Sequence, residues 1–194
     1  MNKYIDFHEF VNTNLGNKGF KIRPVTEEYI VPRLNDVMSF VNGILKEYEN
    51  TYKLWTPKNK EWFLNPMNKK FNYSYTIEDD MGKIVLLNFS SVYGDRLLHN
   101  HCTYVDKSYR NYNLAKLHMI KVCQRGIEDN LTDYEGFWDK YNNGSIILHL
   151  KMGFRIESMR KDEQLLLRGS LHEIIERTYN LYCKESNESS NSPA

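Results

Sequence analysis

The sequence predicts an α/β (α+β) domain, and three observations support this prediction. Strand-like segments with alternating apolar residues are interspersed with segments of helical periodicity along most of the chain. The strand-like run 99–105 leads through a short polar loop into a helical segment that begins at Leu114. The 194 residues are 41% hydrophobic and 26% charged, which suits one globular domain with a single core.

Composition narrows the function classes. The formal net charge of +1 balances 26 basic against 25 acidic residues, so charge does not favour a nucleic acid or an anionic membrane as partner. The N-terminus lacks the pattern of a signal peptide, and no run approaches the ~18 apolar residues of a membrane span. Cys102, Cys123 and Cys183 show no paired spacing, which indicates free thiols. We therefore expect a cytoplasmic protein without nucleic-acid or membrane partners.

The first half of the chain predicts helices and strands in turn. In chain order we expect a helix within 1–19, an edge strand at 20–25, a helix from Thr26 that is interrupted near Pro32 and continues to about 48, an irregular or partly helical segment at 50–72, and a hairpin of 73–78 and 83–91. Gly82 supplies the positive φ that the hairpin turn requires.

The second half follows the same logic. In chain order we expect a strand at 99–105, a helix from Leu114 to about 125, a strand at 134–138, a short helix after Asn143 that Gly153 ends, a hairpin of 154–159 and 164–168, and a helix from 171 to about 183. Asn143 and Gly144 could also form a hairpin turn, but the apolar residues after them fit a helix better. Ser170 and Glu173 form a capping box, and the polar tail 186–194 is expected to be disordered.

The junction between the strand at 99–105 and the next helix is the strongest candidate for a binding site. Its loop carries Lys107, Arg110 and Asn113. Free backbone N–H groups and the positive end of a helix dipole meet at such a junction, where phosphate oxygens bind well. The signal is weak by itself, because neither a P-loop signature nor a dinucleotide GxGxxG motif is present.

Two spacings sharpen this reading. Arg110, Asn113 and Ala115 form the pattern R-x-x-N-x-A, which resembles the R/Q-x-x-G-x-G/A loop of the GNAT superfamily of acyl-CoA N-acyltransferases. The later segment NNGSIILHLKMGF, from Asn142 to Phe154, is similar to that superfamily's second signature, N-x-x-A-x-x-L-Y-x-x-x-G-F. The resemblance covers residues 20–168. It implies a central mixed, mostly antiparallel sheet flanked by helices, with 1–19 and 169–185 as added terminal helices and 186–194 as the tail.

The resemblance implies acetyl-CoA as co-substrate. Main-chain N–H groups of the loop would hold the pyrophosphate, and the end of the preceding strand would pair with the pantetheine arm. Asn113 stands where the family usually has Gly, and Asn is the other residue that best tolerates left-handed geometry. The implied cofactor-binding residues are Tyr104, Val105, Arg110, Asn111, Tyr112, Asn113, Leu114, Ala115, Asn142 and Ser145.

Three histidines are candidate catalytic residues. His149 stands where many GNAT enzymes carry a Tyr that protonates the departing thiolate, and imidazolium is a competent acid near neutral pH. His99 and His101 face the same side of a strand, at positions similar to the proton-relay histidines of the arylalkylamine acetyltransferases. Packing alone is the competing explanation for all three. No third ligand stands at a suitable spacing, so we expect no metal.

The acceptor is less well defined. Aromatic residues that could contact it are Trp55, Trp62, Tyr73, Tyr75, Phe137 and Trp138, and acidic residues that could attract a cationic amine are Asp133, Glu135 and Asp139. The sequence does not choose among a simple amine, an amino sugar, an amino acid and a protein N-terminus. Cys102 is expected to face away from the two strand histidines, which argues against an acyl-enzyme.

The leading hypothesis is an N-acetyltransferase that transfers an acetyl group from acetyl-CoA to a primary amine of a small molecule, by direct attack in a ternary complex. One alternative is a non-catalytic acyl-CoA-binding module, motivated by Asn113 and His149 in place of Gly and Tyr. Another is an N-acyltransferase that takes its acyl group from a carrier protein. A homodimer remains open, because oligomeric state is not readable from the sequence.

Overall fold

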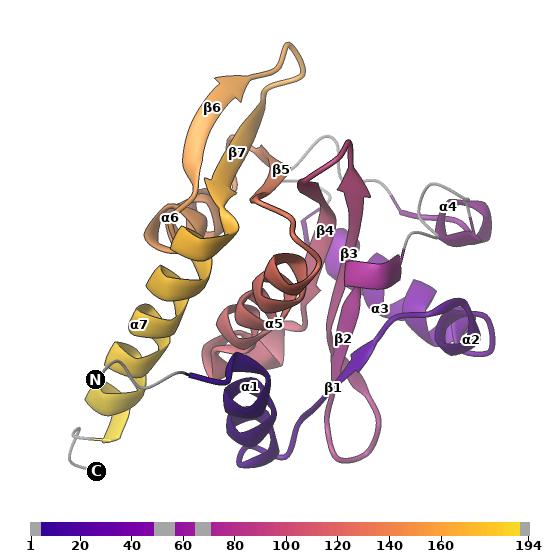
Figure 1. Ribbon diagram of the computed structural model, residues 1–194. Helices are drawn as coiled ribbons and strands as arrows, with labels where there is room; N and C mark the ends of the chain where they lie inside the picture. Colours follow the sequence, from indigo (N-terminus) through magenta and orange to yellow (C-terminus); the bar gives the residue numbers. More distant parts are fainter. Residues whose placement is uncertain (1–4, 49–56, 65–70, 191–194) are drawn as a thin grey trace.

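The computed structural model describes residues 5–48, 57–64 and 71–190. Within these residues, seven strands form one sheet, flanked by helices (Figure 1). The strands are β1 (Lys21–Pro24), β2 (Tyr75–Glu78), β3 (Ile84–Tyr93), β4 (Leu97–Val105), β5 (Asp133–Asp139), β6 (Arg155–Met159) and β7 (Gln164–Ser170). The helices are α1 (Phe7–Gly16), α2 (Glu27–Ile30), α3 (Leu34–Glu47), α4 (Lys60–Leu64), α5 (Leu114–Glu128), α6 (Asn143–Lys151) and α7 (Leu171–Ser190), with 3₁₀ turns η1 (Phe71–Tyr73) and η2 (Lys107–Tyr112).

The sheet is mixed and mostly antiparallel, as predicted. Its strand order is β1-β2-β3-β4-β5-β7-β6. Every neighbouring pair is antiparallel except β4 and β5, which run parallel at the centre. A parallel pair needs a crossover, and α5 supplies it. The one parallel pair is therefore formed by the two strands on either side of the predicted phosphate loop and its helix.

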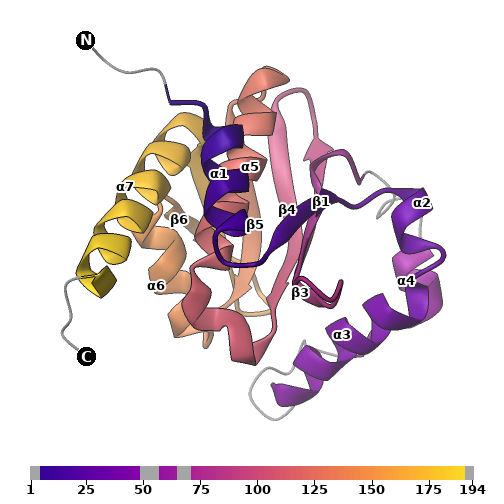
Figure 2. The same ribbon diagram turned by 90° about the horizontal axis from the view of Figure 1, so that it is seen from below.

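Two core clusters lie on opposite faces of the sheet. The larger one includes residues of α1, α5 and α7, with Leu117, Ile120 and Ile174 fully buried. The smaller one lies under α2, α3 and α4 around Val37, Val41 and other apolar residues. Figure 2 shows the two groups of helices on either side of the strands. Both faces of β3 are therefore covered, which explains its nearly continuous burial.

Local signals in the sequence account for most element boundaries. Thr26 caps α2 by accepting a hydrogen bond from the Tyr29 N–H. The helical repeat breaks at Pro32, because proline cannot donate the next helical hydrogen bond, and α3 begins at Leu34. Asn142 accepts a hydrogen bond from the Ser145 N–H, so the segment after it is a helix, as predicted, rather than a hairpin. Gly153 follows that helix with φ of 100°.

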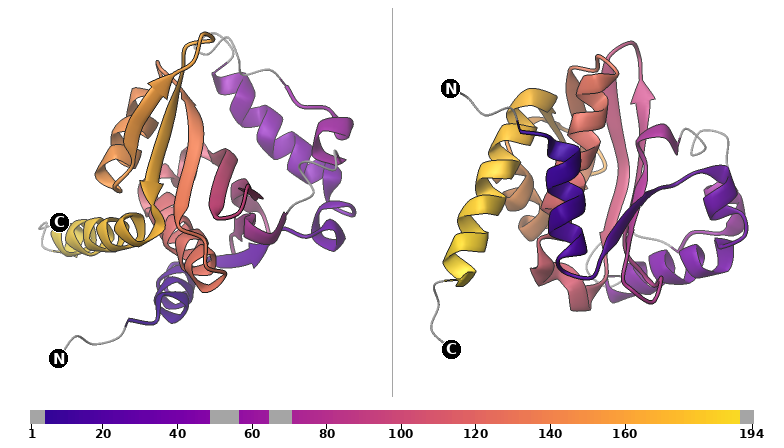
Figure 3. Two further views of the ribbon diagram at one scale, coloured as in Figure 1. Left: turned by 45° about the horizontal axis from the view of Figure 1, so that its top comes forward. Right: turned by 60° about the horizontal axis from the view of Figure 1, so that its bottom comes forward.

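The two terminal helices pack on α5, as the two views of Figure 3 show. Asp6 caps α1 through hydrogen bonds from the His8 and Glu9 N–H groups. The C-terminal helix α7 continues to Ser190, so residues 186–190 are helical and the prediction of a disordered tail from 186 onward is wrong for them. Among the described residues, no helix is long and apolar enough to span a membrane.

Candidate functional site

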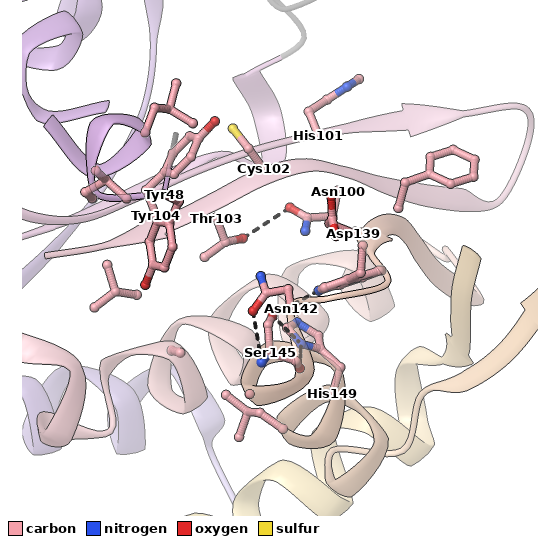
Figure 4. A pocket seen from close by; sticks show the side chains of 18 of the residues that line it. Tyr48, Asn100, His101, Cys102, Thr103, Tyr104, Asp139, Asn142, Ser145 and His149 are labelled. Carbon is pink, nitrogen blue, oxygen red and sulfur yellow. Dashed lines mark hydrogen bonds between the residues drawn. The ribbon is translucent and has the colours of Figure 1, made fainter. Parts of the chain in front are cut away.

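A cleft opens where β4 and β5 diverge. The two strands pair only from Leu97 to Asn100 and from Asp133 to Gly136. Beyond that point β4 continues along β3 and β5 continues along β7, so their facing edges separate. A cavity of about 660 Å³ lies between them, which is within the usual range for small-molecule sites. Figure 4 shows β4 side chains on one side of this cavity and α6 side chains on the other.

The cleft is lined from five parts of the chain. The lining residues are Ile44, Leu45 and Tyr48 at the end of α3; Lys58 and Trp62; Asn100, His101, Cys102, Thr103, Tyr104 and Val105 of β4; Arg110 and Ala115 of the loop; and Phe137, Trp138, Asp139, Asn142, Gly144, Ser145, Leu148, His149 and Gln164 from the second half. Within the described residues β4 pairs with no strand on this side beyond Asn100, so its backbone edge there can pair with an extended ligand.

The predicted phosphate loop has the geometry of an anion site. Asp106 starts η2 by accepting a hydrogen bond from the Ser108 N–H. Asn113 then adopts left-handed geometry, with φ 61° and ψ 19°, and α5 begins. The Asn113 carbonyl accepts from Lys116 and Leu117. Within the described residues this leaves the N–H groups of Leu114 and Ala115, at the positive end of the helix, for an external anion.

Arg110 connects this loop to the far wall of the cleft. Its Nε donates to the Val105 carbonyl at 3.2 Å, and one Nη lies 2.9 Å from a carboxylate oxygen of Glu47 at the end of α3. Its guanidinium carbon lies 5.4 Å from the ring centre of Tyr48. A cation is therefore held at the cleft mouth, between the loop and α3.

On the α6 side, His149 is buried and neutral at pH 7. Burial lowers its pKa to about 4. A ring Nδ1–H accounts for the 2.7 Å contact with the Ser145 carbonyl oxygen, because a carbonyl can only accept. The Trp138 ring lies 4.5 Å from the imidazole, and its Nε1–H donates to the Ser145 hydroxyl oxygen at 3.1 Å. This environment disfavours the imidazolium form that the predicted acid role requires.

The two strand histidines lie together, as predicted. The ring centres of His99 and His101 are 5.0 Å apart. His101 lines the cleft and contacts the Ser91 hydroxyl at 2.7 Å, while His99 lies 3.3 Å from a Glu135 carboxylate oxygen. Burial and the neighbouring His99 lower the pKa of His101 to about 4. The pair thus connects the cleft to a carboxylate on β5.

A β-bulge at His101 corrects the expectation for Cys102. Phe89 pairs with Cys102 and Ser90 with Asn100, so His101 is the extra residue. Asn100 and Thr103 both contact the Asn88 amide, which shows that the alternation of faces shifts between them. Cys102 consequently shares a face with His99, contrary to the prediction. Its thiol is nevertheless a poor nucleophile, because burial raises its pKa to about 12.

The structure divides the predicted residues into two groups. His149, His101, Tyr104, Val105, Arg110, Ala115, Asn142 and Ser145 line the cleft, together with Trp62, Phe137, Trp138 and Asp139 from the predicted acceptor residues. His99, Asn111, Tyr112, Asn113, Leu114, Asp133 and Glu135 are not among the lining residues, and Tyr73 and Tyr75 are buried in the larger core. Trp55 lies outside the described residues.

Sequence reasoning missed the wall formed by α3. Ile44, Leu45 and Tyr48 carry only the periodicity of a core-facing helix, which does not reveal that its last turn reaches a cleft. Asn100 and Thr103 could have been suspected, since polar residues inside a central strand need buried partners. Among the described residues no group of three potential metal ligands gathers, and the expectation of no metal stays a prediction.

Comparisons with known proteins identify the fold. No protein-family model and no curated protein sequence matches the chain. Among solved structures, it is similar to a GNAT-family acetyltransferase from Staphylococcus aureus Mu50, with 15% identity over 78% of this chain and 99% of that one and a TM-score of 0.64. The PaiA N-acetyltransferase from Thermoplasma acidophilum, solved in complex with coenzyme A, shares 11% identity over 78% and 98%, with a TM-score of 0.61.

A third similar structure is the ribosomal-protein-S18-alanine N-acetyltransferase from Escherichia coli. Its identity is 12% over 78% of this chain and 94% of that one, with a TM-score of 0.60. Identities this low report on the fold rather than on the reaction. The described chain has the fold of the GNAT-family acetyltransferases.

Proposed function

We propose that this protein is an N-acetyltransferase that moves an acetyl group from acetyl-CoA to a primary amine of a small molecule, by direct attack in a ternary complex. The observation that carries the proposal is the cleft between the diverging ends of β4 and β5, with the anion-binding start of α5 at one end and the His99–His101 pair beside the other. Acetyl transfer requires both a coenzyme site and a proton acceptor for the amine.

The residues present fit coenzyme A. The N–H groups of Leu114 and Ala115, with Arg110, would hold the pyrophosphate, because several donors and a positive helix end converge there. The open edge of β4 up to Val105 would pair with the pantetheine amides. When bound, this co-substrate supplies an acetyl thioester. Cys102 is not expected to take up the acetyl group, since its thiol stays protonated.

The histidine pair supports deprotonation of the incoming ammonium. His101 is neutral at pH 7 and reaches the cleft, so it is available to accept a proton. It is a weak base alone, and we propose that the proton is relayed from His101 by way of its neighbour His99 toward Glu135, whose carboxylate oxygen lies 3.3 Å from His99 Nδ1. Asp139, which also lines the cleft, adds attraction for a cationic amine.

We further propose that Ser145, rather than His149, hydrogen-bonds the departing thiolate. The Ser145 hydroxyl oxygen accepts from Trp138 Nε1, which leaves its O–H group to donate into the cleft that it lines. His149 donates a hydrogen bond from its Nδ1–H group to the Ser145 carbonyl oxygen and so helps to orient this serine. A Ser145→Ala variant is expected to lose turnover while keeping acetyl-CoA affinity.

The second candidate function is a non-catalytic acyl-CoA-binding module, favoured by the neutral, buried His149 in place of a tyrosine acid. Two measurements separate the candidates. Calorimetry with acetyl-CoA tests whether the protein binds the co-substrate. Release of free thiol from acetyl-CoA, in the presence of a panel of arylalkylamines, amino sugars, amino acids and peptide N-termini, tests whether it transfers the acetyl group. Binding with thiol release supports the enzyme, binding without release across the panel supports the module, and no binding refutes both.

A further inference from the structure

Asn113 holds the phosphate loop in a left-handed conformation, and contacts of its side chain stabilise that conformation. Asn tolerates left-handed geometry better than other non-glycine residues but less well than glycine, so neighbouring contacts contribute to holding it. The Asn113 side chain does not cap its own helix. Its amide oxygen instead accepts a hydrogen bond from Lys116 Nζ at 2.7 Å. The support for the loop therefore comes from a side chain one turn into α5.

Lys116 is itself held by the C-terminal helix. Its ammonium lies 2.7 Å from a carboxylate oxygen of Glu185 on α7, and the Lys116 side chain is only 8% exposed. A buried ammonium requires such partners, because an unpaired charge away from water is strongly disfavoured. Asn113, Lys116 and Glu185 therefore form a chain of two short contacts from the loop to α7.

The part of α7 that carries Glu185 is firmly docked. Tyr182, one turn earlier, is buried, and its hydroxyl donates to Asn14 of α1. The N-terminal segment reaches the same loop through Lys18, whose Nζ donates to the Tyr112 carbonyl next to Asn113 and lies 5.1 Å from the Tyr182 ring centre. Both terminal segments thus reach the loop, although they lie outside the region of GNAT resemblance.

We propose that Lys116 and Glu185 are positioning residues for coenzyme binding, so that α7 is a required part of the coenzyme site rather than an appendage. Lys116 keeps Asn113 in left-handed geometry, and Glu185 keeps Lys116 in place. The N–H groups of Leu114 and Ala115 then point where an anion can bind. This inference rests on the proposed function for its link to coenzyme A, but the structural link between α7 and the loop does not.

A different role for Lys116 is that of a direct phosphate ligand, held back by Glu185. This role predicts the opposite change in acetyl-CoA affinity when Glu185 is replaced by Gln. Glu185→Gln removes a negative charge near the loop. If Lys116 bound phosphate directly, the variant would free its ammonium and tighten acetyl-CoA binding. If Lys116 acts through Asn113, the variant loosens the loop and weakens binding. We expect weakening of about tenfold in Kd.

The experiment is a double-mutant cycle on the full chain, with acetyl-CoA affinity measured by calorimetry. Glu185→Gln and Lys116→Met are each combined with Asn113→Gly, because glycine adopts positive φ without support. We expect the loss from Glu185→Gln to fall to less than about twofold in the Asn113→Gly background. Glu176→Gln is the matched control, since it removes the same charge from an exposed position of α7 and should leave Kd unchanged.

Hydrogen exchange of the loop amides in the unliganded protein gives a readout that does not need the coenzyme. Glu185→Gln should speed exchange of the Lys116 and Leu117 amides, which bond to the Asn113 carbonyl, by about tenfold, and Glu176→Gln should not. Unchanged exchange, tighter binding or an undiminished loss in the Asn113→Gly background overturns the inference. If the unsubstituted protein does not bind acetyl-CoA, the proposed function fails, and exchange alone decides the structural link.

Discussion

Gly136 allows Trp138 to pack at the point where β4 and β5 separate, and Gly136→Ala tests this packing. A Cβ atom at position 136 would lie 2.9 Å from two ring atoms of Trp138 and 3.1 Å from the Asn100 Cβ. Ordinary contacts between carbon atoms are about 3.5–4.0 Å. The indole would have to move by about half an ångström or more.

The Trp138 ring has little room to move. It is 6% exposed and packs against the rings of His149 and Phe154, with distances of 4.5 Å and 5.7 Å between ring centres. Its 3.1 Å hydrogen bond to Ser145 would stretch beyond bonding range if the ring shifted by that distance. Overpacking costs about 1–3 kcal/mol and the lost hydrogen bond about 1 kcal/mol, so we expect a destabilisation of roughly 2–4 kcal/mol.

Urea denaturation of Gly136→Ala against the unsubstituted protein measures this effect. Gly43→Ala is the matched control, because nothing lies within 4 Å of the added atom in the exposed middle of α3. That variant should gain about 0.5–1 kcal/mol, as alanine replaces glycine within a helix. If Gly136→Ala proves as stable as the unsubstituted chain, the close packing of Trp138 over the strand divergence is wrong, and with it the orientation assigned to Ser145.

Three further outcomes are expected. The free energy of unfolding should be level above pH 6.5 and should fall on acidification toward pH 4. Burial lowers the pKa of His118, on α5, to about 3 and the pKa of His149 to about 4, while the same histidines in the unfolded chain take up protons near pH 6.5, so each contributes a slope of up to about 1.4 kcal/mol per pH unit. Urea denaturation curves that coincide at pH 7, 6 and 5 would contradict this expectation. His101→Asn should lower turnover about a hundredfold with little change in acetyl-CoA affinity, and a parallel loss of affinity would point to a structural role instead. Iodoacetamide at pH 8 should modify Cys102 far more slowly than a free thiol, because burial raises the pKa of Cys102 to about 12, and the Cys102→Ser variant should retain turnover. Rapid modification of Cys102, or an inactive serine variant, would favour a mechanism through an acyl-enzyme instead.

Several features of the fold were determined by the sequence alone. The cap at Thr26, the break at Pro32 and the helix end at Gly153 all occur where the residue types predict them. Each depends on the backbone preferences of one or two adjacent residues, so no distant contact is needed to specify it. The resemblance to the two GNAT signatures supplied the mixed sheet, which local patterns could not.

Tertiary structure decided what the site can do. The bulge at His101 placed Cys102 on the same face as His99, because one extra residue in a strand reverses the alternation of side chains. Burial among aromatic rings made His149 neutral, and the pKa of an imidazole depends on surroundings that its own segment does not contain. The contact of Lys116 with Glu185 likewise joins residues far apart in the chain. Helix caps, helix breaks and turns are set by neighbours in the sequence, whereas strand register, desolvation and charge pairing are set by neighbours in space.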